Sequence, residues 1–167
     1  LAAGGAGITA ANKAQAIHAT YLEESERSRL AMFEQVAARA QAQAEAEPGN
    51  PNARYWLAYA LGRYSQGISA TKALAQGMAG RIKAALEATI ALAPSHADAH
   101  VALGAYHAEF VDKLGSLMAR TQGASKEAGL KIFRRALELN PGSPIALIEY
   151  ANGLVMLDGD KRQQEAE

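Results

Sequence analysis

The chain has 167 residues, enough for one domain whose apolar core needs no disulfide or metal to hold it together. Apolar residues make up 49% of the sequence, 39 of them alanine, and aromatic residues only 6%, which favours helices over sheets. The 17 Lys and Arg residues balance the 17 Asp and Glu residues and form no basic stripe, which argues against a nucleic-acid partner.

The beginning of the chain predicts a pair of helices. Apolar residues from Ile8 to Leu22 indicate the first, and those from Phe33 to Ala44 indicate a second that ends near Glu47. The polar stretch 23–29 between them contains no Gly or Pro. It fits either a turn capped by Ser25 or Ser28, which we favour, or the exposed middle of one long helix.

Three later segments share one layout, in which a helix end is followed by proline, a short polar linker and a new helix. The prolines are Pro48, Pro94 and Pro141, and they are spaced by 46 and 47 residues. A proline just past a helix end cannot donate the next hydrogen bond, so it stops the helix. The spacing predicts helical hairpins at approximately 8–48, 49–94, 95–141 and 142–167, the last of them incomplete.

The helix after each proline carries a stripe of apolar residues for packing. In each stripe a large residue is followed by a small one, which lets neighbouring helices approach closely: Leu57-Ala58, Leu103-Gly104 and Tyr150-Ala151. The helix before each proline has its own apolar stripe, for example Leu130, Phe133 and Leu137. The repeating unit is therefore predicted to be a pair of packed helices.

This pattern resembles the tetratricopeptide repeat (TPR), above all at Leu103-Gly104 and in the run Ala136-Leu137-Glu138-Leu139-Asn140-Pro141. The TPR period is ~34 residues, and the excess falls at 64–78 and 110–123, where we expect longer helices with a turn between them. Hairpins of this size also resemble the T-component proteins of tripartite (TRAP) periplasmic transporters. The resemblance implies an all-α, right-handed α-solenoid of about seven helices that spans residues 1–167 as a single domain.

Catalytic chemistry finds little support in the sequence. His100 and His107 lie on one predicted helix and suggest a metal-dependent enzyme as a third hypothesis, but the HExxH pattern is absent and both histidines fall on the packing stripe. The serines are isolated, and no glycine-rich loop fits a nucleotide. We therefore predict no enzyme activity, no cofactor and no bound metal. The absence of cysteine excludes disulfides and thiolate chemistry but leaves the compartment, bacterial periplasm or cytoplasm, open.

A binding surface is the favoured hypothesis, because the first helix of each TPR hairpin lines a concave groove. Carried onto this sequence, the resemblance places six residues in that groove: Asn52, Tyr55, Tyr59, Arg63, Glu109 and Asn152. Tyrosines beside Arg and Asn suit a protein or peptide partner, since they combine apolar area with hydrogen-bonding ends. The alternative is a small-ligand-binding accessory protein of a bacterial envelope transporter, with an apolar ligand between the helices. No apolar run reaches the ~20 residues of a membrane span.

The end of the sequence predicts one more helix at 144–157, a turn at 157–160 and a second helix that begins at Lys161. Residues 161–167 contain no large apolar side chain and so cannot cover Ile148, Leu154 or Val155. We therefore expect either that the native protein continues past Glu167 or that another chain covers this end. A homo-oligomer with a two-fold axis is the simplest form of the second case.

Overall fold

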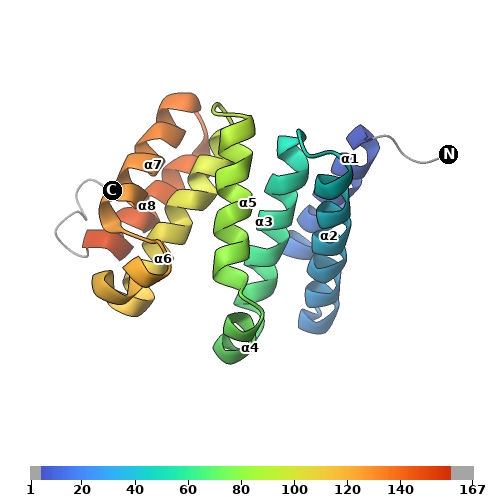
Figure 1. Cartoon of the computed structure of the whole chain (residues 1–167), viewed down its shortest axis with the longest axis horizontal. Helices are drawn as coiled ribbons and strands as arrows, with labels where there is room; N and C mark the ends of the chain where they lie inside the picture. The colour runs from blue at the N-terminus through green and yellow to red at the C-terminus, as the bar shows by residue number, and fades with distance from the viewer. Residues whose placement is uncertain (1–4, 159–167) are drawn as a thin grey trace. The chain divides into compact units, whose positions relative to one another are not determined.

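The computed structural model describes residues 5–158, and throughout this range every regular element is an α-helix (Figure 1). Helix accounts for 84% of these residues. The eight described helices are α1 (Gly5–Tyr21), α2 (Glu26–Ala46), α3 (Pro51–Gln66), α4 (Ala70–Ala75), α5 (Met78–Leu92), α6 (Ala97–Thr121), α7 (Lys126–Leu139) and α8 (Pro144–Asp158). The sequence predicted about seven, and the short α4, in the first inserted segment, accounts for the difference. The helix predicted to begin at Lys161 lies outside the described residues.

The chain divides into two compact units between Ala93 and Pro94. The first unit contains α1 to α5, and the second contains α6 to α8. Each unit is described below by itself. The described helices include none that is both long and apolar enough to cross a membrane.

Local signals explain where the helices begin and end. The Ser25 hydroxyl accepts a hydrogen bond from the Ser28 amide, so α1 and α2 are separated by a capped turn, as predicted, and are not one long helix. Asn50 caps α3 by accepting from the amides of Asn52 and Ala53. The ends of α2, α5 and α7 each lie two residues before a proline, which confirms the predicted stops.

In the first unit, consecutive helices pack side by side: α1 on α2, α2 on α3 and α3 on α5, while α1 also contacts α3 (Figure 1). The predicted stripe of α3 is its core face, with Leu57, Ala58 and Leu61 all buried. Leu86 of α5 is also buried in this unit. Helix α4 is a single short turn of helix against α5.

Buried polar side chains help to join α1 to α2, which the sequence did not indicate. Asn12 is completely buried, and its side-chain oxygen accepts a hydrogen bond of 2.7 Å from Nε of Arg39. Nη2 of Arg39 donates to Oε1 of Gln15 at 2.6 Å. Of the apolar residues that indicated this helix, Ile17, Tyr21 and Leu22 are exposed. Helix α1 is therefore held to α2 by hydrogen bonds and close alanine contacts rather than by a large apolar stripe.

In the second unit, α6, α7 and α8 pack against one another (Figure 1). Phe133 of α7 is almost completely buried in this unit. Glycines on the two neighbouring helices make room for the ring. A Cβ atom at Gly104 of α6 would lie 2.8 Å from the Phe133 ring, and one at Gly153 of α8 would lie 2.4 Å from it. Leu154, expected from the sequence to be uncovered, is also completely buried in this unit.

The two inserted segments lie between the helices of a hairpin, as expected. Residues 64–78 contain α4 and its flanking turns, and residues 110–123 extend α6. Within α6 the helical geometry is interrupted at Gly115, whose φ of 73° and ψ of 159° suit glycine alone. Beyond this kink the chain folds back, and the Tyr106 hydroxyl donates a hydrogen bond of 2.7 Å to the carbonyl oxygen of Gln122.

The buried histidines have structural partners. Nδ1 of His107 accepts a hydrogen bond of 3.0 Å from the amide of Ser125, which joins α6 to the N-terminal cap of α7. Nδ1 of His100 lies 3.0 Å from the carbonyl oxygen of His96 within the same helix. The described residues include no group of three His, Asp or Glu side chains that could hold a metal ion.

His96 makes the start of α6 sensitive to pH. Its Nδ1 accepts a hydrogen bond from the amide of Ala99, which requires the neutral ring. Burial lowers the pKa of His96 below its ordinary value and is opposed by the charge of Asp98, while nearby His100 lowers it further. Because the folded state prefers the neutral ring, the stability from this group is complete above pH ~6.5 and is lost as the pH falls below that value.

We therefore expect the melting temperature to fall by a few degrees between pH 7.5 and pH 5.5, at about 2–4 °C per kcal/mol for a chain of this size. The His96→Asn variant keeps a side chain that caps a helix but cannot titrate. Its melting temperature should fall less over the same range, and circular dichroism melts of both proteins measure the difference. Equal slopes in the two proteins would show that other groups cause the pH dependence.

Candidate binding surface

An aromatic row lies along α3 in the first unit. The rings of Tyr55 and Trp56 are 5.2 Å apart between centroids in an edge-on arrangement, and those of Trp56 and Tyr59 are 5.4 Å apart. One turn further along, the guanidinium carbon of Arg63 lies 5.4 Å from the centroid of the Tyr59 ring, in the range of a cation–π contact. The three predicted residues Tyr55, Tyr59 and Arg63 therefore form one surface, which we call the aromatic row.

Helix α1 fixes the middle of this row. The hydroxyl groups of Tyr59 and Thr20 are hydrogen-bonded at 3.0 Å, and Thr20 also donates to the carbonyl oxygen of Ala16. Because the second bond uses the only proton of the Thr20 hydroxyl, the Tyr59 hydroxyl must donate the first. The Tyr59 ring thus contacts Trp56 and Arg63 and is fixed at its hydroxyl group, while it remains partly accessible to solvent.

A hollow of about 260 Å³ adjoins the row, and Arg63 belongs to both. Its apolar wall is formed by Leu30 and Phe33 of α2, and its polar wall includes Glu26 and Arg29. Thr20, Gln66 and Gly67 complete it. With two arginines and one glutamate, this hollow favours an acidic group beside an apolar one. We call it the arginine hollow.

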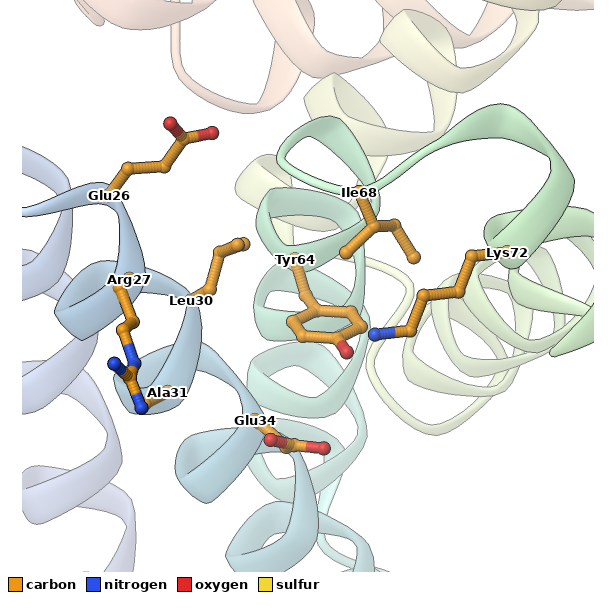
Figure 2. Close-up of a pocket in the computed structure, with 8 residues that line it drawn as sticks. All are labelled: Glu26, Arg27, Leu30, Ala31, Glu34, Tyr64, Ile68 and Lys72. Atoms are coloured by element: carbon orange, nitrogen blue, oxygen red, sulfur yellow. The ribbon is translucent and has the colours of Figure 1, made fainter.

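A second hollow of about 400 Å³ lies on the other side of Leu30, where α2 faces the end of α3 and the start of α4 (Figure 2). In Figure 2, Leu30, Tyr64 and Ile68 line the space between the helices, and the amino group of Lys72 lies beside the Tyr64 ring. Its charged residues are Glu26, Arg27, Glu34 and Lys72. The two acidic and two basic groups balance, so this hollow selects less strongly by charge than the arginine hollow does.

Lys72 is anchored at the edge of this second hollow. Its Nζ lies 5.5 Å from the centroid of the Tyr64 ring. A side-chain hydrogen bond with Tyr64 raises the pKa of Lys72 above its usual value, and the negative charge of Glu34 adds to that shift. Since the shift favours the charged form, Lys72 presents an ammonium group at neutral pH.

The remaining predicted residues are Asn52, Glu109 and Asn152. Asn52 is exposed in the first turn of α3. Glu109 lies on α6 in the second unit, where its carboxylate is paired with Nζ of Lys113 at 2.9 Å. Asn152 is exposed on α8 of the same unit. The structure thus brings together Tyr55, Tyr59 and Arg63 and describes Glu109 and Asn152 in a different compact unit.

Sequence analysis missed the part of both hollows that α2 contributes, which is centred on Leu30. This residue sits in a polar segment, and its role depends on its approach to the end of α3. The end of the Leu30 side chain lies close to Gly67, where a Cβ atom would come within 2.5 Å of it. The available signal was a single large apolar residue, Leu30, next to the predicted turn at 23–29.

Comparisons of the chain with protein-family models and with curated proteins gave no match. The resemblance to TPR proteins and to T-component proteins therefore stays a prediction from the residues.

Proposed function

We propose that the chain is a non-catalytic, TPR-like helical scaffold that binds a protein or peptide through the aromatic row and the arginine hollow. The observation that carries the proposal is the position of Arg63, which stacks on Tyr59 and also lines the hollow. A single extended peptide can therefore contact the aromatic row and the arginine hollow at the same time. Tyr, Trp and Arg are the residue types that contribute most binding energy in protein interfaces.

The scaffold part of the proposal rests on helix order. In the first unit, α1 and α2 form one hairpin, α3 and α5 form the next, and the first helices of the two hairpins touch each other. Hairpins repeated in this way form an α-solenoid, whose right-handed form we propose here from the TPR resemblance. The groove of such a solenoid is lined by the first helices, and the aromatic row lies on one of them.

The composition of the surface defines the expected ligand. The two guanidinium groups of the arginine hollow, from Arg29 and Arg63, favour a carboxylate, and Leu30 and Phe33 favour an apolar neighbour. Tyr55 and Trp56 offer aromatic, apolar contact area further along. We therefore expect peptides in which Asp or Glu is next to a Leu, Phe or Trp residue.

Selection from a random peptide library displayed on phage tests this proposal. The full chain should enrich acidic–apolar sequences, and a synthetic peptide of that sequence should bind in calorimetry. Because Arg63→Glu reverses a charge in the binding surface, it should weaken binding by at least about tenfold. Arg81→Glu is the matched control, since Arg81 is exposed on α5 and lines neither hollow.

Two results would contradict the proposal. One is a failure to enrich any sequence. The other is a peptide that binds the Arg63→Glu and Arg81→Glu variants equally well. Circular dichroism of both variants establishes that each is folded before binding is measured.

A further inference from the structure

Helix α1 buries little apolar surface against the rest of the first unit. Its buried residues are Asn12, Ala16 and Ala19, so no large apolar side chain of this helix is fully buried. Helix α2, by contrast, buries Phe33 and Val36. Because hydrophobic stabilisation grows with the apolar area removed from water, α1 gains less from packing than its neighbour does.

The hydrogen bonds that join α1 to α2 are also incomplete. Gln43 of α2 donates through Nε2 to the carbonyl oxygen of Gly5 at 2.8 Å. However, Oε1 of Gln43 and Nδ2 of Asn12 are buried and find no hydrogen-bond partner within residues 5–158. An element with few apolar contacts and incomplete hydrogen bonds opens at a lower free energy than the rest of a domain. We therefore expect the amides of α1 to exchange with solvent at least about tenfold faster than those of α2 and α3.

Thr20, close to the end of α1, belongs to the proposed binding surface. It lines the arginine hollow, and its hydroxyl is hydrogen-bonded to the hydroxyl of Tyr59 at 3.0 Å. Tyr59 in turn contacts Trp56 and Arg63. When α1 leaves α2, the hollow therefore loses part of its wall, and Tyr59 loses the bond that fixes its hydroxyl group.

We propose that the docking of α1 controls this surface, so that the aromatic row and the arginine hollow are complete only while α1 is packed on α2. The inference takes its ligand from the proposed function, whereas the coupling of α1 to Tyr59 needs no ligand. A peptide that contacts both parts binds the docked form more tightly than the undocked form. Because the two equilibria are linked, the peptide must in turn stabilise the docking of α1, and every undocked molecule lowers the apparent affinity.

The Ala16→Glu variant is designed to undock α1 in the full chain. Ala16 is completely buried, so a glutamate there would place a charge in the contact. Circular dichroism should show the loss of helix equivalent to α1, since a detached helix of 17 residues is only marginally stable in water. Hydrogen exchange should become fast throughout α1 and stay slow in α2 and α3. Ala14→Glu is the matched control, because Ala14 lies on the same helix but is exposed.

Trp56, the only tryptophan of the chain, reports whether undocking reaches the aromatic row. Its ring lies 5.4 Å from that of Tyr59, so its fluorescence should change in Ala16→Glu and stay native in Ala14→Glu. Thr20→Val removes the hydroxyl group that holds Tyr59 and should change the fluorescence in the same direction, whereas Thr20→Ser keeps that group and should not. This measurement requires no peptide.

Calorimetry with the acidic–apolar peptide selected on phage measures the effect on binding. Ala16→Glu should weaken binding by at least about tenfold, although Ala16 lines neither hollow, and Ala14→Glu should bind normally. In the native protein, a saturating concentration of the peptide should slow the hydrogen exchange of α1 by at least about tenfold.

The inference is overturned if α1 exchanges no faster than α2 and α3 in the native protein, or if Ala16→Glu unfolds the whole first unit. It is equally overturned if the fluorescence of Trp56 stays native after α1 has undocked. A peptide that binds Ala16→Glu and Ala14→Glu equally well would refute the control of binding and leave the proposed function intact. If the phage selection yields no peptide, the proposed function fails, and exchange and fluorescence still decide whether α1 controls the aromatic row.

Discussion

The Phe133→Ala variant should lose about 3–5 kcal/mol of stability, because it empties the centre of the second unit. Phe133 is only 1% exposed and lies between Gly104 of α6 and Gly153 of α8, so its removal opens a cavity that backbone on two sides lines. Because helices are stiff, those that line the cavity can move only partly into the empty space. The corresponding fall in melting temperature is on the order of 10 °C.

Thermal and urea unfolding followed by circular dichroism would measure this loss. The matched control is Leu117→Ala in the same unit, where the side chain is 79% exposed and the change should cost no more than about 0.5 kcal/mol. Comparable losses in the two variants would mean that Phe133 is not the centre of the core. Hydrogen exchange would also locate the effect, which should be largest in α6, α7 and α8.

The Gly153→Ala variant should also destabilise the protein, although alanine is ordinarily the better residue within a helix. Alanine gains up to ~1 kcal/mol of helix propensity over glycine. At Gly153, however, the added Cβ would lie 2.4 Å from the Phe133 ring, and overpacking of this kind costs ~1–3 kcal/mol. We therefore expect a net loss of about 1–2 kcal/mol from a substitution of a single methyl group.

The Gly62→Ala variant should change the free energy of unfolding in the opposite direction, as the same unfolding experiments would measure. Gly62 also lies within a helix, but no atom lies within 4 Å of the position that its Cβ would take. That variant should gain about 0.5–1 kcal/mol. Combining Gly153→Ala with Phe133→Leu should give a loss smaller than the sum of the two single losses, because the smaller side chain makes room for the methyl group. Strict additivity, or a stabilising Gly153→Ala, would contradict the packing described above.

Much of the helical layout could be predicted because its signals are local. A proline two residues past each of α2, α5 and α7 stops the chain from continuing as helix, and Ser25 and Asn50 begin new helices by capping them. The large-small pair Leu103-Gly104 marked a close helix contact correctly, although the sequence did not show that Phe133 occupies the space beside the glycine.

The face of α1 could not be predicted, since it depends on residues that are distant in sequence. The apolar residues Tyr21 and Leu22, which helped to indicate a helix here, are exposed, whereas Asn12 is buried. The reason is Arg39, which lies 27 residues from Asn12 in sequence and binds both it and Gln15. Residues that join two helices by hydrogen bonds do not add to the periodic spacing of apolar residues. Only the three-dimensional arrangement therefore reveals such an interface.

The binding surface was predicted in part for the same reason. Tyr55, Tyr59 and Arg63 follow from their spacing on one helix, which the repeat pattern identifies. The arginine hollow also needs Leu30 of α2, whose side chain lies close to Gly67 just past the end of α3. The spacing of residues within one helix can be read from the sequence. The approach of two helix ends depends on the folded unit and cannot.

The kink of α6 at Gly115 separates the packed part of that helix from an exposed tip. Leu114, Leu117 and Met118 around the kink are exposed, whereas the residues that pack against α7 and α8 precede them. Because residues 112–118 are all exposed, the chain can be opened or lengthened there with small cost to stability. Position 116 is thus a natural place for new chain ends in a circularly permuted protein, or for the insertion of a reporter domain.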